Sequence, residues 1–241
     1  MQKLPIKYPG IDLLFPPGMI FCILLGNMKR QTRLPLFPLG LVLLPTMKLP
    51  LHIFEERYRE LVNTCIRENR EFGIVYYNGS TLRKSGSSAS IEQIIQTYDD
   101  GRIDILTQGR KRFHIDRLFE DKPYIEAEVT YYQDEPDLYN RPLDELVTEA
   151  LDRIKKITEL SGKSFSPEDF IGIPAKDLSF LLSATDVLSI EEKQENLESV
   201  SVRCRFERII TAAERHIERI ESTQRIQKML GEDDDISHMF N

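Results

Sequence analysis

Prolines recur at short intervals between Leu34 and Pro50 and restrict how this part of the chain can fold. Proline disfavours the α region for the residue before it, so the repeated Leu-Pro and Phe-Pro steps favour extended backbone. Strands that carry proline are edge strands or have the proline at a strand end. A helix is predicted immediately afterwards, over residues 55–70, and its apolar face is formed by Phe54, Tyr58, Leu61, Val62 and Cys65. The stretch therefore predicts edge strands followed directly by an amphipathic helix.

Further strand signals follow this helix. Short runs of apolar, β-branched and aromatic residues, several with strict alternation, predict strands at residues 72–77, 91–98, 103–107, 113–119 and 125–132. Asp99–Gly101 lies between two of these runs and is a hairpin signal, because Asp and Gly tolerate the positive φ of tight turns. The Gly- and Ser-rich residues 78–90 are predicted to form a polar, mobile loop. Residues 34–133 thus read as a mostly β region with one early helix.

Helical periodicity replaces strand alternation after the polar segment 133–137. Apolar residues recur at three- and four-residue spacing from Leu143 to Ile157 and again from Val202 to Ile220, and we expect these two stripes to pack against each other. Shorter helices are predicted at residues 167–170, 175–183 and 190–198, the last with a capping box formed by Ser189 and Glu192. The final helix is predicted to run over residues 201–230 and to end at Gly231, before an acidic tail.

The composition limits the classes of protein to which this chain can belong. The chain has 241 residues, of which 41% are hydrophobic and 29% charged, with a formal net charge of −7, as expected of a soluble globular protein. The negative balance weighs against a nucleic-acid surface that spans the whole protein. Three widely spaced cysteines indicate neither a zinc knuckle nor a disulfide framework, so we expect a reducing, cytoplasmic location.

Residues 1–30 differ in character from the rest of the chain. Their apolar run, Met19–Leu25, is far shorter than the ~20 residues of a membrane helix, so no membrane association is expected. Met28 directly precedes the proline-rich stretch. We interpret residues 1–30 as an extension outside the domain and expect translation to start naturally at Met28.

No motif for catalysis, metal or cofactor binding is visible. Gly162-Lys163-Ser164 lacks the glycine that a phosphate loop needs five positions earlier, where Ile157 stands. The four histidines form no HxxxH or HExxH pair, so no zinc site is indicated. His52 and Glu55 lie three residues apart, and a local hydrogen bond or helix cap is favoured over a catalytic pair. We expect no enzyme activity, no metal and no cofactor.

Arg110, Lys111 and Arg112 form a basic cluster beside Phe113. Such a cluster can bind phosphate or stack on a base. On a strand, however, Arg110 and Arg112 share one face, and that face is favoured to be solvated or paired with Glu126 and Glu128.

Three segments together resemble the N-terminal domain of Lon proteases. They are the stretch from Leu34 to Tyr58, the segment Gly109–Phe113 followed by Tyr124–Val129, and the segment Glu192–Glu198. Their order and spacing over residues 33–230 carry the resemblance, and Glu56 stands where relatives often have proline. The resemblance implies an α+β fold: a PUA-like β pseudo-barrel over residues 31–135, then a helical bundle over 140–230 with a long last helix, and an acidic tail at 231–241. The resemblance is to the N-terminal domain alone, and we expect no ATPase or protease module in this chain.

By this resemblance, we expect a non-catalytic module that binds exposed or unfolded polypeptide segments, in an adaptor or chaperone-like role. The expected peptide-binding residues are the apolar and aromatic side chains Leu36, Phe37, Leu49, Phe54 and Tyr58. An RNA-binding PUA-like module is the alternative, with Arg110, Lys111 and Arg112 as its support. A cryptic hydrolase is a weaker alternative, without a motif.

Overall fold

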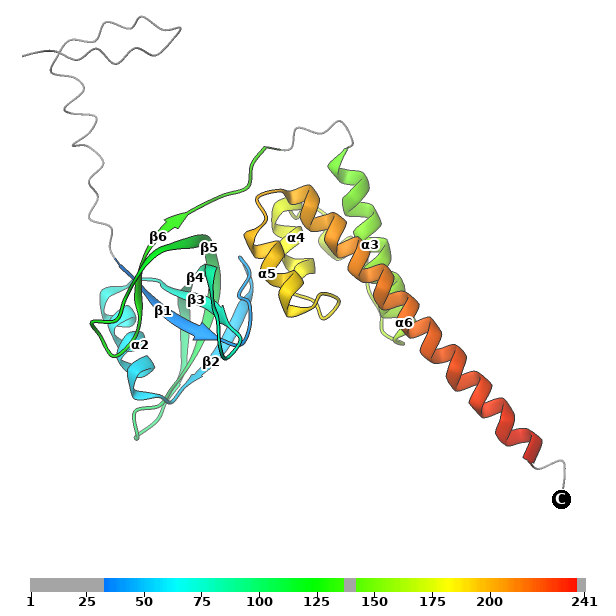
Figure 1. Ribbon diagram of the computed structural model, residues 1–241, viewed down its shortest axis with the longest axis horizontal. Coiled ribbons are helices and arrows are strands. Elements are labelled where there is room, and N and C mark those ends of the chain that lie inside the picture. The colour runs from blue at the N-terminus through cyan, green and yellow to red at the C-terminus, as the bar shows by residue number, and fades with distance from the viewer. Residues whose placement is uncertain (1–32, 137–141, 238–241) are drawn as a thin grey trace, which may run out of the picture. The chain divides into compact units, whose positions relative to one another are not determined.

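The computed structural model describes residues 33–136 and 142–237, with side chains as far as Met229. Residues 1–32, including the expected start at Met28, lie outside the described residues. The first part of the chain forms strands and one helix (Figure 1). They are β1 (Leu34–Leu39), β2 (Lys48–Ile53), α2 (Glu56–Glu68), β3 (Phe72–Tyr77), β4 (Leu82–Thr97), β5 (Ile103–Phe119) and β6 (Glu126–Tyr131).

The six strands form one mixed sheet in the order β2-β5-β4-β3-β1-β6, and an additional β5–β6 pairing closes it into a barrel. β1 and β3 are parallel, and the segment that contains β2 and α2 is the crossover between them; the other pairs are antiparallel. Each end of the long β5 pairs with a different strand. Its first half pairs with β2, while its second half pairs with β6.

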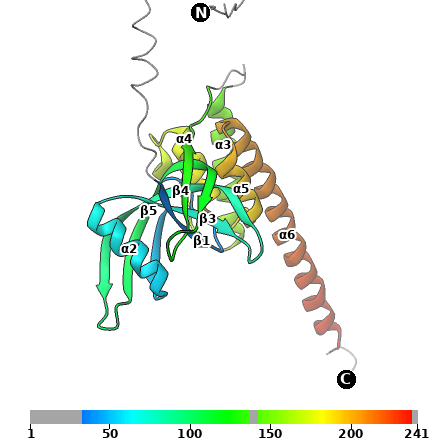
Figure 2. The same ribbon diagram turned by 60° about the vertical axis from the view of Figure 1, so that its left-hand side comes forward.

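The barrel is filled from both its strands and α2. Leu61, Val62 and Cys65 of α2 pack against buried side chains of the strands, among them Phe72 and Ile105. Figure 2 shows α2 lying beside the strands along its whole length. The predicted helix over residues 55–70 is therefore present, and Leu61, Val62 and Cys65 of its predicted apolar face are buried. Phe54, which was assigned to the same face, precedes the helix and is exposed.

The predicted loop over residues 78–90 is wrong. β4 begins at Leu82, and Ser87 and Ser88 are fully buried. Small residues are needed here because the barrel wall is crowded: a Cβ at Gly86 would lie 2.4 Å from the Ile74 carbonyl oxygen. The Gly/Ser composition reflects close packing of a strand, which the sequence pattern alone cannot distinguish from a flexible loop.

The basic cluster also lies inside a strand and not between two. β5 is continuous from Ile103 to Phe119, and Gly109 lets it pass close to the loop between β1 and β2, since a Cβ there would lie 2.2 Å from the Leu44 carbonyl oxygen. The predicted Asp99–Gly101 hairpin joins β4 to β5, where the Tyr98 N–H donates to the Arg102 carbonyl at 2.9 Å.

The second part of the described chain is helical. Its elements are α3 (Leu143–Leu160), the 3₁₀ helix η1 (Pro167–Phe170), α4 (Ala175–Ser183), α5 (Ile190–Glu198) and α6 (Val202–Ser237). The stripes of α3 and α6 pack in one core, as predicted, and both views show these helices side by side (Figures 1 and 2). The capping box of Ser189 and Glu192 is present, and Ser161 is the C-terminal cap of α3, which leaves no phosphate loop at Gly162.

The predicted end of the last helix is wrong. α6 continues through Gly231 to Ser237. Glycine inside a helix costs only about 1 kcal/mol relative to alanine, so a single glycine does not have to end one. Gly231 was predicted to end the helix, but the small energetic cost of a helical glycine does not require this.

Candidate functional site

A groove of about 810 Å³ opens on the barrel where β1 and β2 end and α2 begins. A loop between β5 and β6 forms its other wall. The lining residues are Phe37–Leu39, Leu51–Glu55, Arg57, Tyr58, Tyr77, Leu82, Glu120 and Lys122–Ile125. We call this surface the aromatic groove, because most of the side chains that form it are aromatic or aliphatic.

Aromatic rings form the part of the groove next to α2. The ring centroids of Phe37 and Tyr58 are 4.2 Å apart, and the Arg57 guanidinium lies 4.6 Å from the Tyr58 ring centroid. Burial raises the pKa of Tyr58, with smaller opposing effects of Arg57 and Glu55. Phe54, by contrast, is 61% exposed. It follows the buried Ile53 at the end of β2, so the alternation of the strand directs its ring outward.

Prolines reduce the hydrogen-bonding capacity of both strand edges beside the groove. β1 pairs with β6 only at Leu34 and Pro35, and the Leu36 N–H donates to the Ile125 carbonyl at 2.8 Å. Two residues further along, Pro38 occupies the same edge without an N–H. β2 is a terminal strand of the sheet and contains Pro50. Because proline cannot donate to a ladder, neither edge is suited to accepting an added strand, and the groove offers mainly side chains.

Both basic residues of the groove, Arg57 and Lys122, are paired with carboxylates. Arg57 lies 2.8 Å from Glu55, and the Lys122 ammonium lies 3.0 Å from the buried carboxylate of Glu126. The hydrogen bond to Glu126, opposed by partial burial, raises the pKa of Lys122. Pairing leaves little net charge along the groove, so its apolar side chains dominate what a ligand would meet.

The structure brings three of the five expected peptide-binding residues to this groove. Phe37, Phe54 and Tyr58 line it. Leu36 is fully buried and Leu49 is 9% exposed, and both belong to the barrel core. Phe37 is also part of this core and is only 7% exposed, although it borders the groove. A proline-rich extended stretch has two faces, and without a known register the sequence could not tell which face is covered.

Other lining residues were missed by sequence reasoning. The loop residues Lys122–Tyr124 come from more than 60 positions further along the chain, and no local pattern marks them. His52 was assigned a local bond or cap with Glu55, but its ring nitrogen Nδ1 lies 2.5 Å from Asp104 Oδ1, and Glu55 pairs with Arg57. The Asp104 partner becomes visible only through the β2–β5 register, in which the two residues are opposite each other.

The three residues of the basic cluster, Arg110, Lys111 and Arg112, contact different partners. The exposed Arg110 pairs with Glu92 at 2.7 Å, and the exposed Lys111 lies 5.8 Å from the Tyr131 ring centroid. Arg112 is only 3% exposed and pairs with Asp134 at 2.6 Å. The expected partners Glu126 and Glu128 are replaced by Glu92 and Asp134. All three residues border one hollow of about 240 Å³ together with Lys176, but Arg110 and Arg112 are each paired with a carboxylate.

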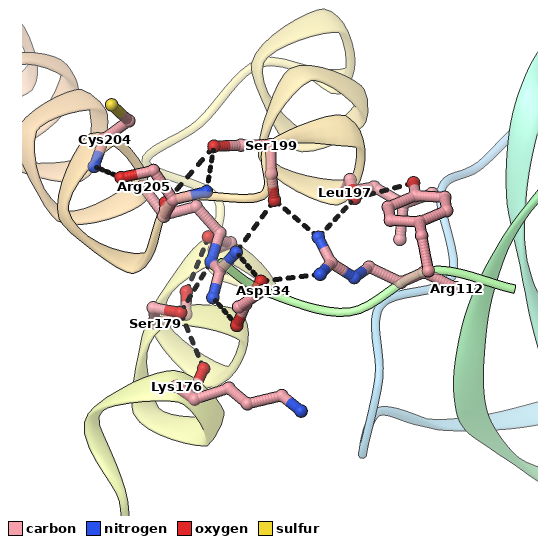
Figure 3. A network of polar contacts seen from close by, with 11 residues as sticks. Arg112, Asp134, Lys176, Ser179, Leu197, Ser199, Cys204 and Arg205 are labelled. Atoms are coloured by element: carbon pink, nitrogen blue, oxygen red, sulfur yellow. Dashed lines mark hydrogen bonds and ion pairs between the residues drawn. The ribbon is translucent and has the colours of Figure 1, made fainter. Parts of the chain in front are cut away.

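Asp134 connects the barrel strands to the helices in a buried network that we call the Asp134 junction (Figure 3). Its Oδ1 accepts from Arg112 of β5 at 2.6 Å and from Arg205 of α6 at 2.7 Å, and its Oδ2 accepts from Arg205 at 2.7 Å. Arg205 also donates to the Ser179 hydroxyl and the Ser199 carbonyl, and Arg112 donates to the Leu197 carbonyl at 3.0 Å.

Charge and burial oppose each other at Asp134. Burial by itself would raise the pKa of this carboxyl, but the hydrogen bond and charge of Arg205, with the charge of Arg112, lower it below the ordinary value. Phe180 lies between the two guanidinium groups, with its ring centroid 4.2 Å from Arg205 and 5.2 Å from Arg112. Each buried charge thus has hydrogen-bond partners, which is the condition under which buried ion pairs are tolerated.

Two kinds of site do not occur in the part of the chain that the structure describes. Three or more metal-ligating side chains do not cluster anywhere in residues 33–136 and 142–237. Within the same ranges, no helix combines the length and apolar character that spanning a membrane requires.

The chain is similar to known proteins of one family. Residues 33–215 match the family described as the ATP-dependent protease La (LON) substrate-binding domain. The chain is 24% identical to the Lon protease of Syntrophus aciditrophicus (strain SB), over 87% of this chain and 28% of that protein. It is 27% identical to Lon protease 1 of Hydrogenovibrio crunogenus, over 77% of this chain and 24% of that protein. The chain spans about a quarter of the length of these curated relatives.

Solved structures show the same fold. A Lon N-terminal domain protein from Xanthomonas campestris superimposes with a TM-score of 0.59 at 26% identity, over 75% of this chain and 98% of that one. The N-terminal domain of a Mycobacterium avium complex Lon protease superimposes with a TM-score of 0.60 over 76% and 98%, and its 17% identity makes this a likeness of fold alone. The expected α+β fold, a PUA-like pseudo-barrel followed by a helical bundle with a long last helix, is confirmed.

Proposed function

Since the chain belongs to the LON substrate-binding domain family, we propose that it is a substrate-recognition module that binds exposed apolar segments of unfolded polypeptides in the aromatic groove. It acts by binding and not by catalysis, in an adaptor or chaperone-like role. Its place of action is the cytoplasm, in keeping with the free cysteines Cys65 and Cys204.

The exposed aromatic surface is the observation that carries this proposal. Phe54 is 61% exposed and Tyr58 is half-buried, in a groove that no described element covers, whereas Phe37 lies at its floor and is 7% exposed. Large exposed aromatic side chains in a concave surface are typical of binding sites, since each can bury substantial apolar area on a ligand. Burying one such ring contributes roughly 1.5–3 kcal/mol. A few rings therefore give the weak, reversible affinity that suits a module sampling many segments.

The edge prolines point to the form of recognition. Pro38 and Pro50 limit strand addition, so binding depends on apolar side chains of the ligand and little on its backbone pattern. Such recognition accepts many sequences, provided that they expose aromatic or aliphatic side chains. Folded proteins hide these side chains, so selectivity for unfolded chains follows.

The groove lacks the components of a hydrolase. His52 and Asp104 form a close pair, but no Ser, Thr or Cys is among the described residues that line the groove. A nucleophilic mechanism needs such a side chain within reach of the base. RNA binding is the less favoured function, because Arg112 is buried and both Arg110 and Arg112 are paired with carboxylates, although they border one hollow with Lys111 and Lys176.

The test is a comparison of an unfolded and a folded form of one protein. We expect labelled, reduced and carboxymethylated α-lactalbumin to bind, as measured by fluorescence anisotropy, and native α-lactalbumin not to bind. The Phe54→Ala variant should lose about tenfold in affinity, which corresponds to about 1.4 kcal/mol. Ile171→Ala removes a side chain that is 81% exposed on the helical part and serves as the matched control. Equal affinity of both variants and the parent protein would refute the assignment of the groove.

A further inference from the structure

His52 has one hydrogen-bond partner, Asp104, which lies outside the groove and is itself bonded by Tyr98. The Nδ1 atom of His52 lies 2.5 Å from Asp104 Oδ1, and the Tyr98 hydroxyl donates to the other carboxylate oxygen, Oδ2, at 2.8 Å. His52 is on β2, Asp104 is opposite it on β5, and Tyr98 follows β4. Three segments of the barrel thus converge on one imidazole.

The same imidazole contacts the most exposed ring of the groove. The rings of His52 and Phe54 are stacked, with centroids 6.0 Å apart and an interplanar angle of 26°. The Tyr98 ring meets His52 edge-on at 5.9 Å. His52 therefore lies between a fixed polar support and a ring that is 61% exposed and otherwise faces solvent.

We propose that His52 is the positioning residue of the aromatic groove: it fixes the orientation of Phe54, and its protonation strengthens that hold and tightens binding of apolar segments. This inference rests on the proposed function for its effect on binding, but its effect on Phe54 stands independently. The stacking and the two hydrogen bonds carry it. A preorganised ring loses less conformational entropy when a ligand binds.

Other charged groups around His52 are occupied. Arg102 stacks on Tyr98 at 4.9 Å and pairs with Asp100 at 2.7 Å, and Arg59 of α2 donates to the Asp100 carbonyl at 2.8 Å. On the groove side, Glu55 and Arg57 pair with each other. Among the described groups, Asp104 is the carboxylate in hydrogen-bond contact with the ring.

The charge state of Asp104 sets the direction of the effect. The hydrogen bond from His52, followed by that from Tyr98, lowers the pKa of Asp104, so this carboxylate stays ionised where histidines titrate, between about pH 5 and pH 8. A neutral imidazole can still donate one hydrogen bond, but a protonated one makes a charge-assisted bond, which is roughly twice as strong. Protonation also favours stacking of the imidazole on the Phe54 ring.

A tryptophan reporter tests the positioning without any ligand. The chain contains no tryptophan, so Phe54→Trp introduces a single one, whose emission is quenched by contact with a protonated imidazole. We expect emission to fall as the pH is lowered from about 8 to about 5.5, and the change to vanish when His52→Asn is added. His114→Gln is the matched control and should leave the curve unchanged. An identical curve with His52→Asn would overturn the inference.

Binding provides the second readout. We expect carboxymethylated α-lactalbumin to bind the parent protein about two- to fivefold more tightly at pH 6 than at pH 8, and His52→Asn to weaken binding and remove most of this dependence. His114→Gln should keep it. If Phe54→Ala weakens binding while His52→Asn changes neither affinity nor pH profile, the inference on His52 fails and the proposed function stands. If the parent protein does not bind at all, the proposed function fails, and the tryptophan titration alone decides whether His52 positions the ring at position 54.

Discussion

The aromatic groove and the Asp134 junction use the same pair of side-chain types in different surroundings. In the groove, Arg57 lies 4.6 Å from the ring of the half-buried Tyr58, beside the exposed Phe54. In the junction, Arg205 lies 4.2 Å from the ring of Phe180, and both residues are almost completely buried. The junction satisfies its charges with hydrogen bonds and has no apolar surface left to offer. The groove pairs Arg57 with Glu55 and leaves the Phe54 ring exposed. We propose that similar chemistry serves stability in the junction and recognition in the groove.

The largest expected effect is a loss of stability when the Asp134 junction is mutated. Asp134→Asn leaves Arg112 and Arg205 buried without their counter-charge, and breaking a buried ion pair in this way costs about 3–5 kcal/mol. Urea unfolding should show this loss. Asp100→Asn, which removes an exposed pair with Arg102, is the matched control and should cost less than about 1 kcal/mol. Equal stability of the two variants would mean that the junction does not hold the fold together.

Acid should remove the same contribution without a mutation. The pKa of Asp134 is lower in the folded protein than in the unfolded chain, where an aspartate titrates near about 3.9. The stabilisation is therefore complete above that value and is lost as the pH falls through the lower, folded-state pKa. The difference in unfolding free energy between the parent protein and Asp134→Asn should be constant from about pH 5 to pH 7 and shrink below about pH 4. A difference that grows on acidification would contradict this sign.

The smallest expected effect concerns an arginine that belongs to neither region. Arg110 is exposed and pairs with Glu92 at the surface of the barrel. Arg110→Ala should change the free energy of unfolding by no more than about 1 kcal/mol and leave polypeptide binding unaltered. A loss of more than about 2 kcal/mol in urea unfolding would show that exposure is a poor guide to the roles of these arginines.

The sequence predicted the helical part better than the barrel, for a physical reason. A stripe such as Leu143–Ile157 recurs within one helix, so its period and its partner stripe on α6 could be read locally. The small residues of β4 were interpreted as a loop because their purpose, close approach to Ile74, depends on a strand distant in the chain. The capping box of α5 was predicted because both of its members lie within four residues.

The residues of the candidate site also differ in how far the sequence could predict them. Phe54 and Tyr58 were expected from the family resemblance and the density of proline, leucine and aromatic residues between Leu34 and Tyr58, and the same reasoning placed the fully buried Leu36 in the set. Asp104 and Asp134 escaped notice, since each acts on a residue brought near only by strand register or by the packing of α6. Single carboxylates carry no local signal of their partner. A sequence pattern does not show which residues that are distant in the chain pair in the fold.

Photo-crosslinking tests most directly whether the aromatic groove is the surface that binds unfolded polypeptide. A photoreactive phenylalanine analogue would replace Phe54 in one sample and Ile171 in another, and each would be irradiated with carboxymethylated α-lactalbumin. Both positions are exposed, at 61% and 81%, so their accessibility is comparable. We expect crosslinks from position 54 that native α-lactalbumin does not give, and none above background from position 171. Crosslinks from position 171 with none from position 54 would contradict the assignment of the groove.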